Sequence, residues 1–341
     1  MLGKLLSKTK PKEVTTLLQP PKHIEIVVHN YCNFKCKMCN VWKHKDPESI
    51  PMDSLYKTID QLQAFKTKDL TIQFIGGETL LYKGLTKAIT HASSYGYRVG
   101  VTTNGYMLNK EKVIELSKAG LSFINLSLDS IKKDTHNELR GVKNSYEKIM
   151  RAIVNFKIFA PHINLGINSV ITNHNMNSII ELSRFTLIEP KVNTLYFIAL
   201  DKPYESEYGD DWMYNSEVSD LWPKDKQIIN QVFDSLIQEK KINLKIGNSI
   251  TQLNSYKAYY LNPNNFIKKF GCKFGDSNLF INSYSQARLC VKRPDMDSIG
   301  NINDEHVFDI WHSKKSKEVR QKMNQCKLNC VQILSCDFED E

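Results

Sequence analysis

Short apolar runs alternate with amphipathic segments along the first 200 residues of the chain. Residues 23–28 form a β-branched run between Pro20-Pro21 and a cysteine-rich loop, which predicts a buried first strand. Beyond it, strand and helix periodicities take turns. Further strands are predicted at 70–75, 98–102, 123–128, 163–171 and 195–200, and helices at 52–66, 81–94, 109–119, 146–159 and 176–187.

This alternation predicts an α/β fold with a parallel sheet. Repeated strand–helix units give right-handed crossover connections. Six such units make an open, partial (β/α)6 barrel of the TIM type, in which functional residues gather at the carboxyl ends of the strands. We assign the barrel to residues 21–200, after an N-terminal extension at 1–20.

The rest of the chain has a different pattern. Residues 201–222 are loop-like and acidic, and are either a segment that closes on a substrate or a solvated connector. Helices are predicted at 224–241, 249–261 and 308–323, with a hairpin formed by 279–282 and 286–289. We therefore expect a connecting region at 201–265 and a small α+β domain at 266–341.

Composition and charge restrict the class of protein. Of 341 residues, 41% are hydrophobic and 24% are charged, which is typical of a globular protein. No apolar run approaches the roughly 20 residues that span a bilayer, and no export signal precedes residue 22, so we expect a cytoplasmic protein without a membrane segment. The net charge of +9 is concentrated at 4–12 and 312–327. A solvated helix face explains this better than nucleic-acid binding, because no basic strand is interleaved with aromatic residues.

Three cysteines in one loop carry the most specific chemistry. Cys32, Cys36 and Cys39 follow the first strand with the spacing Cys-x3-Cys-x2-Cys. Three thiolates suit soft metals, yet no second Cys or His pair lies nearby to close a tetrahedral zinc site. A loop of three thiolates that holds a 4Fe-4S cluster leaves one iron open to a substrate or cofactor.

The motif resembles that of radical S-adenosylmethionine (SAM) enzymes. The resemblance implies that Cys32, Cys36 and Cys39 are the catalytic cluster ligands, and that SAM chelates the open iron. The reduced cluster then cleaves SAM to a 5'-deoxyadenosyl radical, which abstracts hydrogen from a substrate. Met38 stands where the family usually has an aromatic residue, and its thioether is expected beside the adenine.

The second strand runs into Gly76-Gly77-Glu78-Thr79, which is similar to the Gly-Gly-Glu-Pro motif of the same family. That resemblance implies that this segment binds the SAM amino group through its backbone and the Glu78 carboxylate. Thr79 replaces the family's proline. Taken alone, the segment is an ordinary turn.

Other strand ends carry polar residues that resemble the family's SAM contacts. Asn104 ends the third strand, Ser127 and Asp129 the fourth, and Asn168 lies on the fifth. The resemblance implies that they contact the ribose or carboxylate of SAM, and that Arg140 binds the carboxylate. The alternatives are helix caps and turns, a surface arginine, and a strand polar group with a protein partner.

Five cysteines near the C-terminus form a second group. They are Cys272, Cys290, Cys326, Cys330 and Cys336. Their spacing around the hairpin and the last helix resembles the twitch domain, a shortened SPASM domain with one auxiliary Fe-S cluster. The resemblance implies a second 4Fe-4S cluster with Cys272, Cys290 and Cys326 among its ligands, while Cys330 and Cys336 compete for the fourth place. A zinc site remains an alternative.

The expected function is radical SAM catalysis with an auxiliary cluster for electron transfer. Expected partners are a small biosynthetic metabolite or a peptide as substrate, and an electron donor such as flavodoxin or ferredoxin. The competing hypothesis is a non-catalytic iron-sulfur or zinc protein whose basic C-terminal helix binds nucleic acid or a protein. Such a protein would not need Gly76-Gly77-Glu78 at a strand end.

Overall fold

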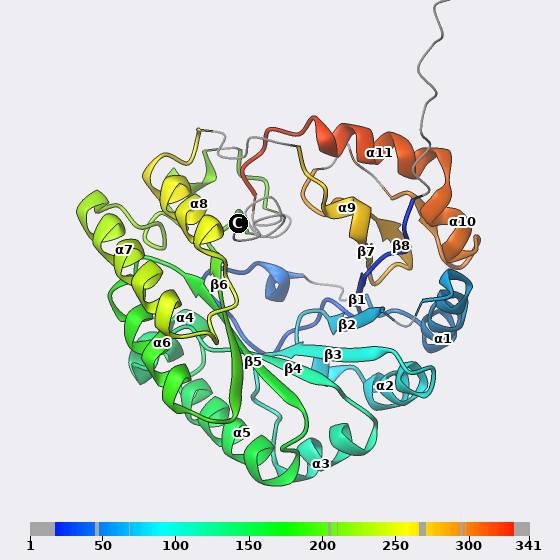
Figure 1. The fold of residues 1–341 in the computed structure, drawn as a ribbon, viewed down its shortest axis with the longest axis horizontal. Helices are drawn as coiled ribbons and strands as arrows, with labels where there is room; N and C mark the ends of the chain where they lie inside the picture. The colour runs from blue at the N-terminus through cyan, green and yellow to red at the C-terminus, as the bar shows by residue number, and fades with distance from the viewer. Residues whose placement is uncertain are drawn as a thin grey trace, which may run out of the picture.

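The structure is a computed structural model of the whole chain, viewed in Figure 1. It describes residues 18–44, 48–67, 69–203, 206–209, 211–265, 271–293, 296 and 298–330. Cys336 and the N-terminal extension before residue 18 lie outside the described residues.

A single nine-stranded sheet organises the described part of the chain, in the order β6-β5-β4-β3-β2-β1-β7-β8-β9. Strands β1 to β6 are parallel, β7 joins β1 in parallel, and β7, β8 and β9 pair antiparallel. The strands are β1 (His23–Val27), β2 (Thr71–Ile75), β3 (Arg98–Thr103), β4 (Phe123–Ser127), β5 (Asn164–Ile171), β6 (Val192–Ala199), β7 (Asn278–Ile281), β8 (Gln286–Arg288) and β9 (Gly300–Asn301).

Helices cover the outer side of the curved sheet (Figure 1). The α-helices are α1 (Met52–Gln61), α2 (Leu85–Ser94), α3 (Lys110–Lys118), α4 (Lys133–Arg140), α5 (Ser145–Phe159), α6 (Ile179–Ile188), α7 (Lys226–Ile242), α8 (Ile250–Leu261), α9 (Phe274–Ser277), α10 (Val307–His312) and α11 (Lys314–Asn324). Short 3-10 helices are η1 (Val41–Lys43), η2 (Leu62–Phe65), η3 (Thr79–Leu81), η4 (Met176–Ser178) and η5 (Trp212–Tyr214). The predicted open partial barrel is confirmed.

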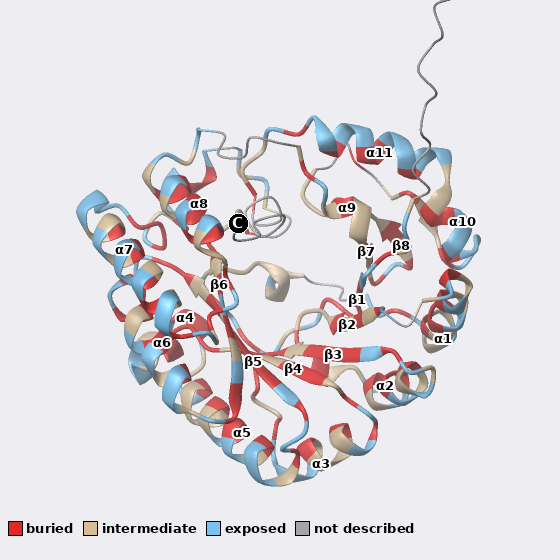
Figure 2. Cartoon of the chain, in the orientation of Figure 1, coloured by how far each residue is buried: buried red, intermediate tan, exposed pale blue. Residues whose placement is uncertain are grey.

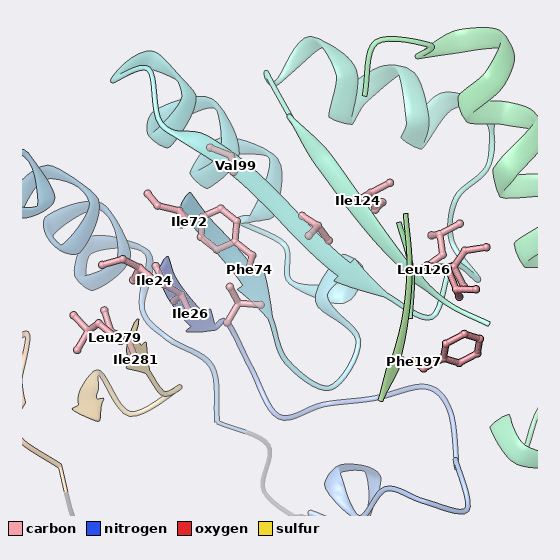
Figure 3. Packing of buried hydrophobic residues seen from close by; sticks show 14 of the residues in the cluster. Ile24, Ile26, Ile72, Phe74, Val99, Ile124, Leu126, Phe197, Leu279 and Ile281 are labelled. Atoms are coloured by element: carbon pink, nitrogen blue, oxygen red, sulfur yellow. The ribbon is translucent and has the colours of Figure 1, made fainter. Parts of the chain in front are cut away.

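The alternation of the strands explains the two faces of the barrel. Ile24 and Ile26 of β1 are fully buried, as are Ile72 and Phe74 of β2, and they face the helices. The intervening side chains, such as Glu25, point to the inner side, because successive strand residues alternate faces. Figure 2 shows the buried residues along the strands, and Figure 3 shows this apolar layer continuing to β7.

Three features differ from the sequence expectations. The helix α4 was not predicted, because its buried residues are mostly polar. The predicted helix at 308–323 is two helices, since Ser313 ends α10 and its side chain accepts a hydrogen bond from the Ser316 N–H at 3.1 Å. The hairpin strand β7 extends the barrel sheet, so no break in the sheet separates the barrel from the C-terminal region.

The segment after β6 is a packed part of the structure where it is described. Trp212 and Trp222 are buried, with ring centroids 5.6 Å apart. Trp222 also lies 5.2 Å from the ring of Tyr259 on α8. This aromatic cluster fixes the segment against α8, which the expectation of a solvated connector did not foresee.

Candidate active site

The first cysteine group lies at the carboxyl end of β1. Cys32, Cys36 and Cys39 form a loop in which the Phe34 N–H donates to Cys32 Sγ at 3.4 Å and the Cys39 N–H to the Cys36 carbonyl at 3.2 Å. The indole N–H of Trp42 also donates to the Cys36 carbonyl at 3.2 Å. These bonds fold the loop so that its thiols act on one another electrostatically.

Burial makes these thiols poor anions by themselves. Burial, with a smaller contribution from the neighbouring thiols, raises the pKa of Cys32 to about 11 and that of Cys36 to about 12. Thiolates here therefore need a strongly cationic partner. No three His, Cys, Asp or Glu side chains of the described chain are arranged for a single metal ion. An iron-sulfur cluster binds each thiolate through a different iron, so the residues present fit a cluster better than one ion.

The predicted glycine motif packs against the approach to this loop. The Gly77 N–H donates to the His29 carbonyl at 3.0 Å, and the Glu78 N–H to the Tyr31 carbonyl at 2.8 Å. A Cβ atom on Gly76 would lie 2.5 Å from the His29 carbonyl oxygen, and one on Gly77 would lie 2.1 Å from that of Tyr31. Both glycines are therefore required for the close backbone contact that sets the cysteine loop beside the end of β2.

Glu78 lies inside this arrangement. Its side chain is 1% exposed. One carboxylate oxygen accepts hydrogen bonds from the Leu80 N–H at 3.1 Å and the Thr103 hydroxyl at 2.5 Å, and the other from the Asn104 N–H at 2.8 Å. Burial raises the pKa of Glu78, and these hydrogen bonds partly offset the rise. Both carboxylate oxygens therefore have partners within the protein, and the direct contact of Glu78 with the SAM amine stays a prediction.

Two residues that the sequence did not single out complete the network. The His29 ring lies with Nε2 2.8 Å from the Glu78 carbonyl oxygen, which accepts its hydrogen bond. The Asn104 side-chain amide donates to Asn33 Oδ1, inside the cysteine loop, at 2.8 Å. Thr79 is buried, and its hydroxyl has no partner within the described residues. The position of His29 at a strand end was the only signal that sequence offered for it.

Asp129 and Arg140, each predicted to contact SAM, bind each other. Arg140 Nε lies 2.6 Å from Asp129 Oδ2, and Nη2 lies 2.9 Å from Oδ1. The Val170 N–H donates to the same Oδ1 at 3.0 Å, and Asp129 is fully buried. In this structure the carboxylate binds Arg140 and the β5 backbone, and the contacts of both residues with SAM stay predictions.

The neighbouring His136 supports this pair. Burial lowers the pKa of His136 to about 4, so the ring is neutral. Its Nδ1 accepts a hydrogen bond from the Asp129 N–H at 3.2 Å. The ion pair is therefore enclosed by α4 and the end of β4.

The C-terminal end of α4 also contacts the cysteine loop. The Lys37 N–H donates to the Leu139 carbonyl at 2.9 Å. Gly141, with φ of +67°, brings the chain so close that a Cβ would lie 2.5 Å from the Lys35 carbonyl oxygen. In the same turn, burial would lower the pKa of Arg140, but the charges of Asp129 and Cys36 raise it overall. Arg140 is accordingly a fixed cation beside the Cys36 thiol.

Ser127 and Asn168 are the predicted SAM contacts that stay available. They are register partners on β4 and β5, and therefore lie on the same inner face. Both are partly exposed, and neither side chain makes a hydrogen bond within the part of the chain that the structure describes. Met38 is partly buried against the core.

The second cysteine group meets at one small cavity. Cys272, Cys290, Cys326 and Cys330 all line it, together with apolar Met296 and Met323 and the cations Lys292 and Arg293. All four cysteines are buried, and Arg293 Nη1 lies 3.9 Å from Cys326 Sγ. Four thiols around one apolar space match the ligand set of a fully protein-bound cluster. Cys330 thus lies at the same cavity as the three expected ligands, and Cys336 is outside the described residues.

Comparison with protein families identifies the chain. A sequence model of the radical SAM superfamily matches residues 26–185, and a model of the SPASM iron-sulfur cluster-binding domain matches residues 272–331. The chain belongs to the radical SAM superfamily. The family predicted from the cysteine and glycine motifs is confirmed, and so are its cofactors, the SAM-binding 4Fe-4S cluster and an auxiliary Fe-S cluster.

Relatives of this radical SAM protein have diverse named activities. The Fe-coproporphyrin III synthase of Methanosarcina barkeri is 30% identical over 43% of this chain and 36% of its own length. A GTP 3',8-cyclase of Clostridium perfringens is 26% identical over 61% of this chain and 64% of its own. The chain thus spans less than two thirds of these relatives.

One solved structure illustrates the shared fold. Streptococcus suis SuiB bound to S-adenosylmethionine superposes with a TM-score of 0.66 at 19% identity, over 93% of this chain and 72% of SuiB. SuiB bound to its precursor peptide SuiA gives a TM-score of 0.65, also at 19% identity, over 88% and 66%. At such identity the likeness establishes the fold alone.

No helix of the described radical SAM chain is long and apolar enough to span a bilayer.

Proposed function

We propose that this protein is a cytoplasmic radical SAM enzyme that reductively cleaves SAM and abstracts hydrogen from a small metabolite or a peptide. An electron donor such as flavodoxin or ferredoxin supplies the reducing equivalent. The seven described cysteines are all free thiols, in keeping with a reducing compartment.

The observation that carries the proposal is the assembly around Cys32, Cys36 and Cys39. The loop that carries these three thiols contacts the glycine motif on one side and α4 on the other. A non-catalytic iron-sulfur protein has no need of a loop held between two such elements. The combination of a three-thiol site and a four-thiol site supports one cluster with an open iron and one without.

When bound, the first cluster and SAM together supply a 5'-deoxyadenosyl radical that removes a hydrogen atom from the substrate. Cys32, Cys36 and Cys39 would hold that cluster, and the backbone of Gly76 and Gly77 would bind the methionyl amine. Ser127 and Asn168 offer unpaired polar side chains to the ribose from the inner face of the barrel.

Two predicted contacts take positioning roles in this proposal. Glu78 joins the ends of β2 and β3 and thereby shapes the SAM site. Arg140, oriented by Asp129, stabilises the Cys36 thiolate by its charge. Cys272, Cys290, Cys326 and Cys330 hold the auxiliary cluster, which we infer transfers electrons, because four thiolates leave it no open iron.

Anaerobic reconstitution tests the proposal. The purified chain is expected to bind about eight irons, from two 4Fe-4S clusters. With dithionite and SAM it should release 5'-deoxyadenosine, measured by chromatography. The variant Cys32→Ala/Cys36→Ala/Cys39→Ala should bind about four irons and form no 5'-deoxyadenosine. A triple variant that keeps all its iron, or a wild-type protein that never forms 5'-deoxyadenosine, contradicts the proposal.

A further inference from the structure

A cavity of about 640 Å³ lies next to the auxiliary cysteine group. It is bounded by the chain that follows β6, by η5, by the end of α8 and by the cysteine segment near Cys330. Its volume falls in the range of small-molecule sites, roughly 300–1,000 Å³. Buried Trp212, Met213 and Tyr259 give it an apolar, aromatic floor.

The walls of this cavity carry an excess of positive charge. Its basic residues are Lys202, Lys292, Arg293 and Lys327, and its acidic residues are Asp201 and Asp211. We call this cavity the basic pocket. Lys292 is neutralised by Asp201, with Nζ 2.6 Å from Oδ2. The other lysines of the lining, Lys202 and Lys327, are the cations on which a ligand could act.

Two of these cations have no counterion among the described residues. Neither Lys202 nor Lys327 forms an ion pair with any residue that the structure describes. They line the pocket from different segments, Lys202 from the chain after β6 and Lys327 from the segment after α11. Two cations in a cavity that is also lined by aromatic side chains suit a ligand that combines an anionic group with a flat apolar part.

The basic pocket adjoins the auxiliary site directly. Lys292, Arg293, Leu328 and Cys330 line both cavities. A cluster held by four thiolates is itself negatively charged, so some of the nearby positive charge serves that cluster. Arg293, 3.9 Å from Cys326 Sγ, is the clearest case. Lys202 and Lys327 line the basic pocket but not the cysteine cavity. Their substitution therefore tests ligand binding separately from the auxiliary cluster.

We propose that the basic pocket binds the anionic group, a phosphate or a carboxylate, of a small-molecule substrate and places it against the auxiliary cluster. The inference rests on the proposed function and narrows its substrate to an anionic compound with a flat apolar part. Lys202 and Lys327 bind the anion, and Trp212 and Tyr259 contact the apolar part.

The test uses small probes and the reconstituted protein under anaerobic conditions at low salt. Phenyl phosphate and benzoate represent the two anions, and benzyl alcohol is the neutral control. Titration calorimetry should give an affinity for at least one anionic probe that is tenfold or more above that for benzyl alcohol. The variant Lys202→Gln/Lys327→Gln should lower this affinity about tenfold, which corresponds to about 1.4 kcal/mol. The matched control is Lys315→Gln/Lys317→Gln, which removes two exposed lysines of α11 and should leave binding unchanged.

Three results overturn the inference. They are equal binding of benzyl alcohol and both anions, unchanged anion binding by Lys202→Gln/Lys327→Gln, or an equal loss in the control. A shift of the auxiliary-cluster potential in the pocket variant without any loss of anion binding would assign the lysines to the cluster, which also overturns it. 5'-Deoxyadenosine is measured in the same preparations. A wild type that forms it while the lysines prove irrelevant refutes the pocket alone, whereas a wild type that never forms it refutes the proposed function.

Discussion

The two cysteine groups are built in opposite ways. Cys32, Cys36 and Cys39 come from eight consecutive residues, and a polar network through Asn33, Asn104 and Glu78 holds their loop. The second group collects its cysteines from distant segments around an apolar cavity. A loop with three thiols leaves room for an exchangeable partner, whereas four thiols around one space enclose what they bind.

This difference determines how each group responds to change. Besides this network, backbone hydrogen bonds hold the first loop, such as that from the Lys37 N–H to the Leu139 carbonyl. The position of the second group depends on the packing of β7, β8 and α11 against the barrel sheet. A substitution in one cysteine group should therefore affect that group and leave the other group intact.

The largest separation is expected when each group is removed in turn. Cys39→Ala should abolish 5'-deoxyadenosine formation, because the first cluster loses a ligand. Cys272→Ala/Cys290→Ala should keep formation within about threefold of wild type with dithionite, while iron falls to about four per chain. Both are measured in one anaerobic assay. Loss of 5'-deoxyadenosine in the double variant would show that the auxiliary group supports SAM cleavage itself, and the comparison would fail.

The fourth auxiliary ligand gives the next largest effect. Cys330 lines the cavity with the other three cysteines, so Cys330→Ala should lose most of the auxiliary iron. Cys336→Ala is the matched control, and we expect it to keep about eight irons and its auxiliary EPR signal. If the Cys336 variant is the one that loses iron, the ligand set is wrong, although the two-group comparison stands.

Local patterns made most of the barrel and the first cysteine group predictable. Apolar periodicity located β1 to β6 within a few residues, because each strand packs its alternate side chains on helices. The helix α4 was missed because His136, Asn137 and Arg140 are buried polar residues, which hydrophobic periodicity does not detect.

Long-range pairing was not predictable from local pattern. The sequence indicated the hairpin but not that β7 pairs with β1, some 250 residues away. Nor did it indicate that Asp129 and Arg140, two polar residues at separate element ends, bind each other. A motif position can locate a residue at the site, but its partner depends on which side chains the fold brings near.

Arg140 sharpens the comparison because it is a buried cation, held by Asp129, beside the first cysteine group. Arg140→Met leaves Asp129 buried without its partner, and we expect a loss of about 3–5 kcal/mol in the free energy of unfolding. Asp129→Leu/Arg140→Met removes both charges and should regain most of that stability in urea titrations. If the charge of Arg140 stabilises the Cys36 thiolate, the first cluster of the double variant should have a lower midpoint potential than that of the wild type. The potential is measured by EPR titration. An unchanged potential would make the ion pair structural only.

The smallest expected effect concerns Glu78, whose carboxylate joins β2 and β3 beside the first group. Glu78→Gln keeps the shape but loses the charge that accepts hydrogen bonds from the Leu80 N–H, the Thr103 hydroxyl and the Asn104 N–H. One poorly satisfied buried donor costs about 1–3 kcal/mol, so we expect a loss of that order in the free energy of unfolding. Because the SAM site is shaped by this junction, SAM affinity should fall severalfold while iron at both groups stays at wild-type level.

Glu78→Ala leaves every donor unpaired, so it should lower both the free energy of unfolding and the SAM affinity further. If instead Glu78→Gln weakens SAM binding a hundredfold without any loss of stability, the carboxylate contacts SAM directly, and its inward orientation changes when SAM binds.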